Sequence, residues 1–218
     1  YKTDLNKSVI LENFVDRNWN ETAEEDENWN FYWASVNSIK NIFNGRSGFK
    51  LQDNQIVNHF PNWYELCRKD HLAKNIKKYK KSLLKEGKNT DYLDFLPLTY
   101  QLPNDMSMFI EEFKKQPNYL WILKPANRSQ GSGIVLVNKL NKIKKMNFER
   151  KITSENNQIV TVNDSYIISR YIDNPLLIGG KKFDMRMYVL VTSYHPLKVW
   201  KFKYGFCRFC NEKFTVDI

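Results

Sequence analysis

The feature that most restricts the fold of this chain is a pair of short apolar runs in its second half. Residues 121–125 read Trp-Ile-Leu-Lys-Pro and residues 134–137 read Ile-Val-Leu-Val, with Gly131 and Gly133 between them. Two such runs separated by turn residues predict a β-hairpin. Lys124 ends the first run, where desolvating an ammonium group is costly unless an anion meets it. The pattern allows a phosphate-binding hairpin, because glycine lets the backbone approach an anion closely, but an ordinary turn with an edge lysine is the simpler alternative.

The rest of the second half predicts a mixed α/β fold. Further strand patterns lie at residues 166–172, 185–192 and 199–209. The polar segment 142–164 is expected to form a helix followed by a flexible loop. We therefore expect two regions, an N-terminal mixed helical and strand region over residues 1–118 and a central α/β region over residues 119–218.

A second group of charged residues follows the glycine pair 179–180. Lys182, Asp184 and Arg186 alternate along a predicted strand, so all three point to one face of it. Arg208 is a further cationic candidate on the last strand. A charged face of this kind needs a charged ligand or water beside it, and both a nucleotide cleft and a solvent-facing edge strand satisfy that need.

Positive charge concentrates in a predicted helix over residues 64–85. The chain has a net charge of +10, and residues 61–88 hold nine basic and three acidic groups. One side of the helix can be shared by Leu66, Leu72, Ile76, Tyr79 and Leu83. Lysines occupy much of the rest, namely Lys74, Lys77, Lys78, Lys80, Lys81 and Lys85. A basic surface attracts polyanions such as nucleotide phosphates or acidic protein tails. A soluble helix with a charged face is the simpler alternative.

Several classes of protein are disfavoured by the sequence. No apolar run approaches the roughly 18 residues of a membrane-spanning helix, and the N-terminus has no signal-peptide pattern. Three cysteines are too few for a disulfide framework, and Cys207-x-x-Cys210 lacks the partners of a zinc site. No RNA- or DNA-binding signature accompanies the positive charge. We expect a soluble intracellular protein that binds neither nucleic acid nor membrane.

Long strings of the sequence resemble the tubulin–tyrosine ligase-like family. They are WILKP…RSQGSGI, YIISRYIDNPLLIGGKKFDMRMYVLV and GFCRFC, and the strings NWNFYWASV and QIVNHFPNWYELCRKDHLAKNIKKYKK resemble its polyglutamylase branch. The resemblance implies an ATP-grasp-like fold. It also implies a ligase that uses ATP to add glutamate to side-chain carboxyls in tubulin C-terminal tails, through an acyl phosphate. A tubulin glycylase, a tyrosine ligase or a non-catalytic microtubule-binding protein remains an alternative.

The resemblance assigns roles to individual residues. It implies that ATP phosphates are bound by Lys124, Gln130 and Gly131, and that adenine is contacted by Ser169, Arg170, Tyr171 and Ile172. Lys182, Phe183 and Asp184 match a nucleotide-binding motif. Arg186 lies close to the reacting groups as the catalytic candidate. Arg208 matches the arginine that holds the carboxylate of the incoming amino acid, a contact suited to the planar guanidinium fork.

The family pattern also includes magnesium ligands, an Asp and a Glu-x-Asn, which this sequence does not match. Glu155-Asn156-Asn157 lies in a polar loop, and we reject it as that motif. We expect the Mg²⁺ ligands C-terminal to residue 218, and a chain that is a fragment or an incomplete gene model. The implied partners are tubulin or microtubules, free glutamate and other polyglutamylase subunits. The implied location is the cytoplasm and cytoskeleton, in a cilium, flagellum or basal body.

Overall fold

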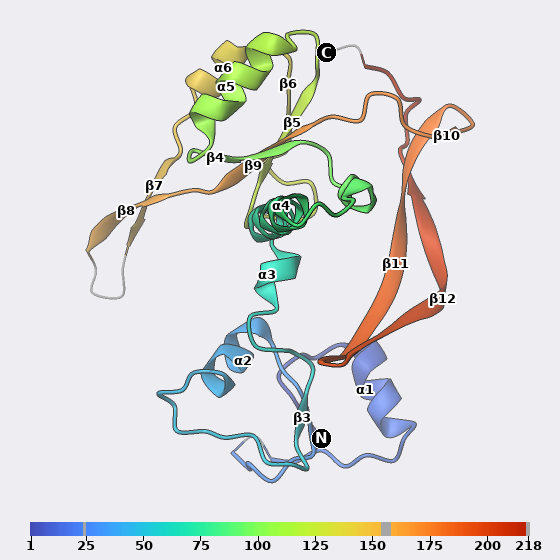
Figure 1. Ribbon diagram of the computed structural model, residues 1–218. Coiled ribbons are helices and arrows are strands. Elements are labelled where there is room, and N and C mark those ends of the chain that lie inside the picture. The colour runs from blue at the N-terminus through green and yellow to red at the C-terminus, as the bar shows by residue number, and fades with distance from the viewer. Residues whose placement is uncertain (24, 154–157, 217–218) are drawn as a thin grey trace. The chain divides into compact units, whose positions relative to one another are not determined.

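A computed structural model describes residues 1–23, 25–153 and 158–216 of the chain. These residues fall into two compact units, Tyr1–Leu72 and Ala73–Ile218, which are described separately below (Figure 1). The second unit takes in a strand that precedes residue 118, as shown below. The division into regions 1–118 and 119–218 stays a prediction about domains.

The first unit is built on a small parallel sheet of three short strands in the order β1-β2-β3. The strands are β1 (Lys2–Thr3), β2 (Phe31–Trp33) and β3 (Ile56–Val57), and the helices are α1 (Ser8–Val15), α2 (Val36–Ile42) and α3 (Tyr64–Cys67). The buried centre of this unit contains Trp29, Tyr32, Ala34 and Ile39. Aromatic side chains fill this core because each of them removes a large apolar area from water.

The predicted helix over residues 64–85 is two helices rather than one. α3 ends at Cys67, and α4 runs from Lys69 to Lys85. Arg68 lies between them with extended backbone (φ −78°, ψ 134°), which interrupts the helical hydrogen bonding. The apolar spacing continues across this break, so periodicity alone could not reveal it. The single-helix prediction is therefore wrong at this point, while the basic helix itself is confirmed over α4.

The second unit contains a four-stranded antiparallel sheet in the order β4-β9-β5-β6. Its strands are β4 (Thr99–Leu102), β5 (Trp121–Pro125), β6 (Val135–Val137) and β9 (Tyr166–Arg170). Trp121 is paired with Val137 and Leu123 with Val135, which confirms the predicted hairpin. β4 joins the sheet by pairing with β9, so residues before 118 take part in it.

One face of this sheet forms the main core with two helices, α5 (Met106–Lys115) and α6 (Leu140–Lys144) (Figure 1). Trp121 and Leu123 on β5 are fully buried, and Phe109 and Ile143 from the two helices belong to the same cluster. Because side chains alternate along a strand, Ile122 and Lys124 point to the other face of the sheet. The core therefore fixes which face Lys124 occupies.

The segment 142–164 differs from its prediction. After α6 the chain forms a hairpin of β7 (Glu149–Thr153) and β8 (Ile159–Asn163), instead of a helix followed by a flexible loop. The β-branched residues of the sequence Ile-Val-Thr-Val at 159–162 favour a strand, a signal hidden by the polar residues around them. The rejected Glu155-Asn156-Asn157 lies outside the described residues.

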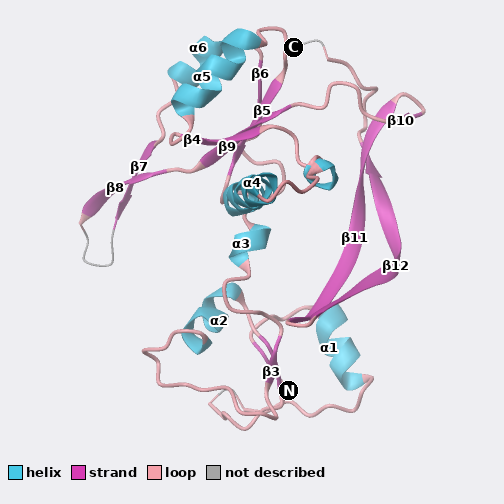
Figure 2. Cartoon of the chain, viewed as in Figure 1, coloured by secondary structure: helices cyan, strands magenta, loops and turns pink. Residues whose placement is uncertain are grey.

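The last sheet has the order β10-β11-β12 and is dominated by a long hairpin, drawn as two magenta arrows in Figure 2. It consists of β10 (Leu177–Ile178), β11 (Lys181–Tyr194) and β12 (Leu197–Phe209), all antiparallel. The predicted strands at 185–192 and 199–209 are confirmed within it. The unit also contains a short 3₁₀ helix, η1 (Asp91–Leu93). Over the described part of the chain, every helix is too short or too polar to cross a bilayer.

Candidate functional site

Lys124 is a half-buried residue near the end of β5, on the sheet face opposite α5 and α6. It lies across from Ile167 of β9, and Ile122 lies across from Ser169. Residues that pair across antiparallel strands project to the same face, so Lys124 and Ser169 share one face of the sheet. The structure thus brings together one residue predicted for the phosphates and one predicted for adenine.

The glycine loop follows directly after β5 and is exposed to solvent. Gln130, Gly131 and Gly133 all have positive φ values of 56°, 77° and 72°. A Cβ on Gly133 would lie 2.9 Å from Cγ of Pro125, whereas one on Gly131 would meet nothing within 4 Å. Gly133 is therefore required by close packing as well as by backbone conformation, and Gly131 by conformation alone.

The four residues predicted to contact adenine have different surroundings. The Ser169 hydroxyl is buried and lies 2.8 Å from the Thr99 hydroxyl of β4. The Arg170 guanidinium lies 3.6 Å from the ring centre of Tyr119, in a cation–π contact. Arg170 pairs with Trp121, so it projects to the helix-covered face, away from Lys124. Of the four, Ser169 is the residue that shares the face of Lys124.

Tyr171 and Lys182 connect the segment after β9 to the start of β11. The Lys182 ammonium donates a hydrogen bond to the Tyr171 hydroxyl at 2.9 Å. The same ammonium lies 5.4 Å from the ring centre of Phe214. Ile172 follows Tyr171 and is exposed. This contact brings the predicted adenine segment next to the predicted Lys-Phe-Asp motif, two groups eleven residues apart.

The alternation predicted for Lys182, Asp184 and Arg186 is confirmed, since all three lie in β11. Asp184 is paired with Arg208 of β12, so this arginine joins the same face. Phe183 pairs with Phe209 on the other face, with their ring centres 5.4 Å apart. The charged residues therefore share one face of the hairpin, and the Phe183–Phe209 pair lies on the opposite face.

Asp184 and Arg208 form a bidentate ion pair on this charged face. Nε of Arg208 lies 3.0 and 3.2 Å from the two carboxylate oxygens, and Nη2 donates a further hydrogen bond. These hydrogen bonds, and secondarily the positive charges of Arg208 and Arg186, lower the pKa of Asp184. The hydrogen bonds to Asp184 likewise raise the pKa of Arg208. The guanidinium is thus already oriented for a carboxylate, and Asp184 supplies one.

Most of the predicted residues lie on two different sheets, which the hydrogen bond between Lys182 and Tyr171 links. Lys124, Gln130, Gly131 and Ser169 belong to the four-stranded sheet and its loop, and Lys182, Asp184, Arg186 and Arg208 belong to the β10-β11-β12 sheet. Among the described residues, no three or more His, Cys, Asp or Glu side chains are gathered so that they could hold a metal ion. The thiols of Cys67, Cys207 and Cys210 are free and exposed.

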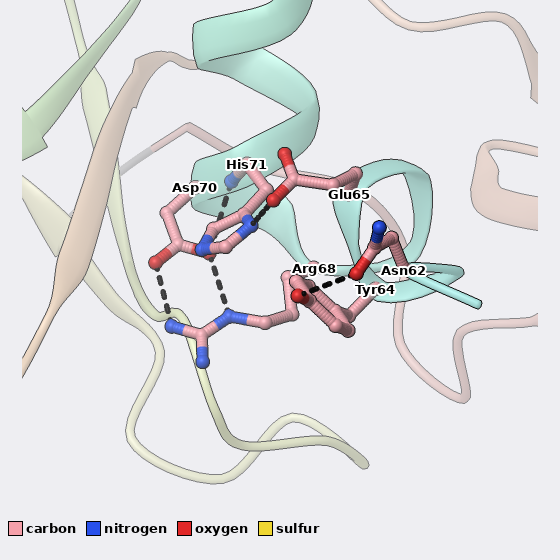
Figure 3. A network of polar contacts seen from close by, with 6 residues as sticks. All are labelled: Asn62, Tyr64, Glu65, Arg68, Asp70 and His71. Carbon is pink, nitrogen blue, oxygen red and sulfur yellow. Dashed lines mark hydrogen bonds and ion pairs between the residues drawn. The ribbon is translucent and has the colours of Figure 1, made fainter. Parts of the chain in front are cut away.

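The sequence did not single out a polar network around the break between α3 and α4 (Figure 3). The Asp70 side chain is only 2% exposed and accepts hydrogen bonds from Nε and Nη2 of Arg68, at 3.1 and 2.7 Å. The backbone N–H of His71 also donates to Asp70, and Nδ1 of His71 lies 3.0 Å from Glu65. The sequence feature that could have indicated this network is the Arg-x-Asp spacing of Arg68 and Asp70. Arg68 and the backbone N–H of His71 satisfy the buried Asp70 carboxylate, which a buried polar group requires. These hydrogen bonds join the residue at the break to the first turn of α4.

Comparisons with known proteins match most of this sequence. Residues 49–217 match a sequence model described as the tubulin-tyrosine ligase family. The "Probable alpha-tubulin polyglutamylase Ttll1" of Tetrahymena thermophila is 51% identical over 228 residues, covering 100% of this chain and 55% of that protein. The "Probable tubulin polyglutamylase TTLL9" of Rattus norvegicus is 37% identical over 225 residues, covering 91% of this chain and 48% of that protein.

A more distant relative, the "Probable tubulin polyglutamylase TTLL2" of Homo sapiens, is 33% identical over 226 residues, covering 97% of this chain and 32% of that protein. The chain spans about half the length of the first two relatives. The family match covers most of the chain, including the glycine loop and the charged face of β11 and β12. The chain belongs to the tubulin-tyrosine ligase family.

Proposed function

We propose that this chain is the nucleotide- and amino-acid-binding part of a tubulin polyglutamylase with an ATP-grasp-like fold. The proposed reaction adds glutamate to side-chain carboxyls in the acidic C-terminal tails of tubulin. The observation that supports it most is the 51% identity, over the whole chain, to a relative named as an alpha-tubulin polyglutamylase. A mixed α/β architecture with antiparallel sheets is compatible with that fold.

The proposed ATP contacts fit the geometry of the glycine loop. Gly131 has nothing within 4 Å of where its Cβ would be, so its backbone is open to a polyanion, and Lys124 provides a positive charge on the adjoining strand. We assign Lys124, Gln130 and Gly131 to the phosphates, and Ser169, Arg170, Tyr171 and Ile172 to adenine. Lys182, Phe183 and Asp184 complete this proposed set. ATP, when bound, supplies the phosphoryl group that activates the acceptor carboxyl.

Arg208 is proposed to hold the carboxylate of the incoming glutamate. Its guanidinium already binds the carboxylate of Asp184 through two nitrogens, which is the geometry that a free amino acid would use. Arg186 shares this face and is proposed to orient the reacting groups. The contribution of these residues is positioning and positive charge, which lower the barrier when charge develops during transfer.

Magnesium remains a proposal without a site in the described part of the chain, where no suitable group of carboxylates is gathered. Other polyglutamylase subunits are proposed partners, and the proposed location is the cytoskeleton, including cilia, flagella or basal bodies. Neither point is needed for the assignments of Lys124 and Arg208.

The test is amino-acid transfer by the full-length protein. Purified tubulin is incubated with ATP, magnesium and isotopically labelled glutamate, glycine or tyrosine, and the tails are analysed by mass spectrometry. We expect glutamate on side-chain carboxyls in the tails. Transfer of glycine or tyrosine instead would identify a glycylase or a tyrosine ligase. Failure to transfer any of the three, by a protein that binds microtubules, would identify a non-catalytic binding protein.

A further inference from the structure

The seventeen-residue helix α4 carries two rows of lysines in different surroundings. Lys77 and Lys80 form the inner row. Nζ of Lys77 lies 3.6 Å from a carboxylate oxygen of Asp105 and 5.3 Å from the ring centre of Tyr100. Lys80 forms an ion pair with Asp94. Both lysines of the inner row therefore form ion pairs with carboxylates of the second unit.

The outer row consists of the exposed residues Lys74, Lys78, Lys81 and Lys85. Steps of four, three and four residues keep these lysines within about 60° of one another around the helix, over a length of about 16 Å. Leu83, on the opposite side of α4, is buried. The outer row is thus a straight line of four cations facing away from the packed side of the helix.

The acidic residues closest to the outer row along the chain have other partners. Asp70, the sole acidic residue in the sequence of α4, is bound by Arg68, and Glu86 forms an ion pair with Lys88 at 2.7 Å. A helix usually gains stability from opposite charges four residues apart. Asp70 has this spacing to Lys74, but its carboxylate is bound by Arg68, and no acid of α4 lies four residues from Lys78, Lys81 or Lys85. Four like charges in one line oppose helix stability, so an anionic partner would relieve a local repulsion.

We propose that the outer row is a docking surface for a glutamate-rich peptide, namely the substrate tail and the glutamate chain that grows on it. This inference rests on the proposed function. Each transfer joins the amine of a glutamate to a carboxyl as ATP is converted to ADP and phosphate, so one carboxylate is consumed and two arrive. The product gains one negative charge at every step. A surface of four lysines would therefore hold longer glutamate chains more tightly.

The composition and length of the row favour an acidic peptide over nucleic acid. All four cations are lysines, which are mobile point charges that can follow carboxylates at irregular spacing. The row lacks the arginine forks and aromatic platforms that bind phosphates and bases well. An extended peptide of about five residues matches the length of the row. The affinity should thus rise steeply up to about five glutamates and more slowly beyond.

The experiment measures binding of fluorescein-labelled oligoglutamates of two, four, six and eight residues to the full-length protein, by fluorescence anisotropy without ATP. The test variant replaces Lys74, Lys78, Lys81 and Lys85 with Gln. A matched control replaces four other exposed lysines with Gln, namely Lys139, Lys142, Lys144 and Lys145. We expect the test variant to bind the hexaglutamate about tenfold or more weakly, and the control to bind within about twofold of the parent. Replacing the outer row with Arg should restore binding.

Three results would overturn the docking surface: an equal loss in the control variant, unchanged binding by the test variant, or binding of hexathymidylate as tightly as hexaglutamate with the same loss. Circular dichroism verifies that all variants keep their helices. Glutamate transfer to tubulin is measured in parallel on the parent protein. An inactive parent contradicts the proposed function, whereas an active parent that fails to bind oligoglutamate contradicts the docking surface alone.

Discussion

Asp184 and Arg208 lie directly opposite each other on β11 and β12, and the guanidinium donates hydrogen bonds to both carboxylate oxygens. The two residues are 24 positions apart in the chain, and the family resemblance implies different ligands for them, a nucleotide for Asp184 and an amino acid for Arg208. Both side chains are more than half exposed. A ligand carboxylate that binds Arg208 must therefore compete with, or share the guanidinium with, Asp184.

The first prediction concerns the titration of Asp184. Its pKa is lowered chiefly by the hydrogen bonds from Arg208, and less by the charge of Arg186. The ion pair is therefore present above the ordinary carboxyl pKa and is lost as pH falls through the lowered value. NMR titration of the side-chain carboxyl should show that Arg208→Ala raises the Asp184 pKa markedly, and that Arg186→Ala raises it less. The reverse order would contradict the assigned cause.

The second prediction concerns the amino-acid substrate. In the full-length protein, Arg208→Ala should raise the glutamate concentration needed for half-maximal transfer by about tenfold or more, while ATP affinity changes much less. Arg208→Lys should be only partly active, because an ammonium cannot form the two parallel hydrogen bonds of a guanidinium. Transfer kinetics and ATP calorimetry provide the two readouts. An equal loss of ATP affinity and of glutamate dependence in Arg208→Ala would contradict a specific role of Arg208 in binding the amino acid.

The third prediction concerns Lys124. Removing its ammonium by Lys124→Ala should weaken ATP binding by about 10- to 150-fold, the effect of one charge-assisted hydrogen bond. Lys139→Ala, at an exposed position on the same unit, serves as the control and should bind ATP like the parent. Calorimetric titration of the full-length protein measures both affinities. If Lys124→Ala binds ATP like the parent, the phosphate-binding role of Lys124 is wrong, and the loop is an ordinary hairpin turn.

The fourth prediction separates the two glycines of the loop. Gly131→Ala should cost about 1 kcal/mol of unfolding free energy, because alanine resists positive φ. Gly133→Ala should cost more, about 2 kcal/mol or above, because its Cβ would also meet Pro125 at 2.9 Å. Urea unfolding of both variants tests the ranking. Equal costs would show that Pro125 shifts readily and that only the backbone conformation matters.

The fifth prediction concerns the break between α3 and α4. Asp70→Ala removes a buried carboxylate that accepts hydrogen bonds from Arg68 and from the backbone N–H of His71, and should lower the unfolding free energy by about 1–3 kcal/mol. The control is Glu65→Gln, which alters a contact of a half-exposed carboxylate and should cost about 0.5 kcal/mol or less. Thermal unfolding checks both variants. A smaller effect for Asp70→Ala than for Glu65→Gln would mean that the network does not stabilise the fold.

Local sequence patterns were sufficient for the elements with strong periodicity. The hairpin of β5 and β6 follows from two apolar runs and the glycines between them, and the shared face of Lys182, Asp184 and Arg186 follows from strand alternation. The patterns failed where polar residues masked a strand, at β7 and β8, and where apolar spacing ran through a break, at Arg68. In both cases the backbone conformation depends on contacts with other residues, namely the pairing of β7 with β8 and the hydrogen bonds between Arg68 and Asp70.

The sequence by itself determined the family, the strands and glycine loop that carry the candidate residues, and the basic character of α4. Tertiary structure decided which of those residues meet. The pairing of β11 with β12 placed Arg208 opposite Asp184. The packing of α4 divided its lysines into an inner row, which forms ion pairs with Asp105 and Asp94, and an outer row on another side of the helix. Periodicity fixes directions along one element, but a contact between residues far apart in the chain depends on how separate elements pack.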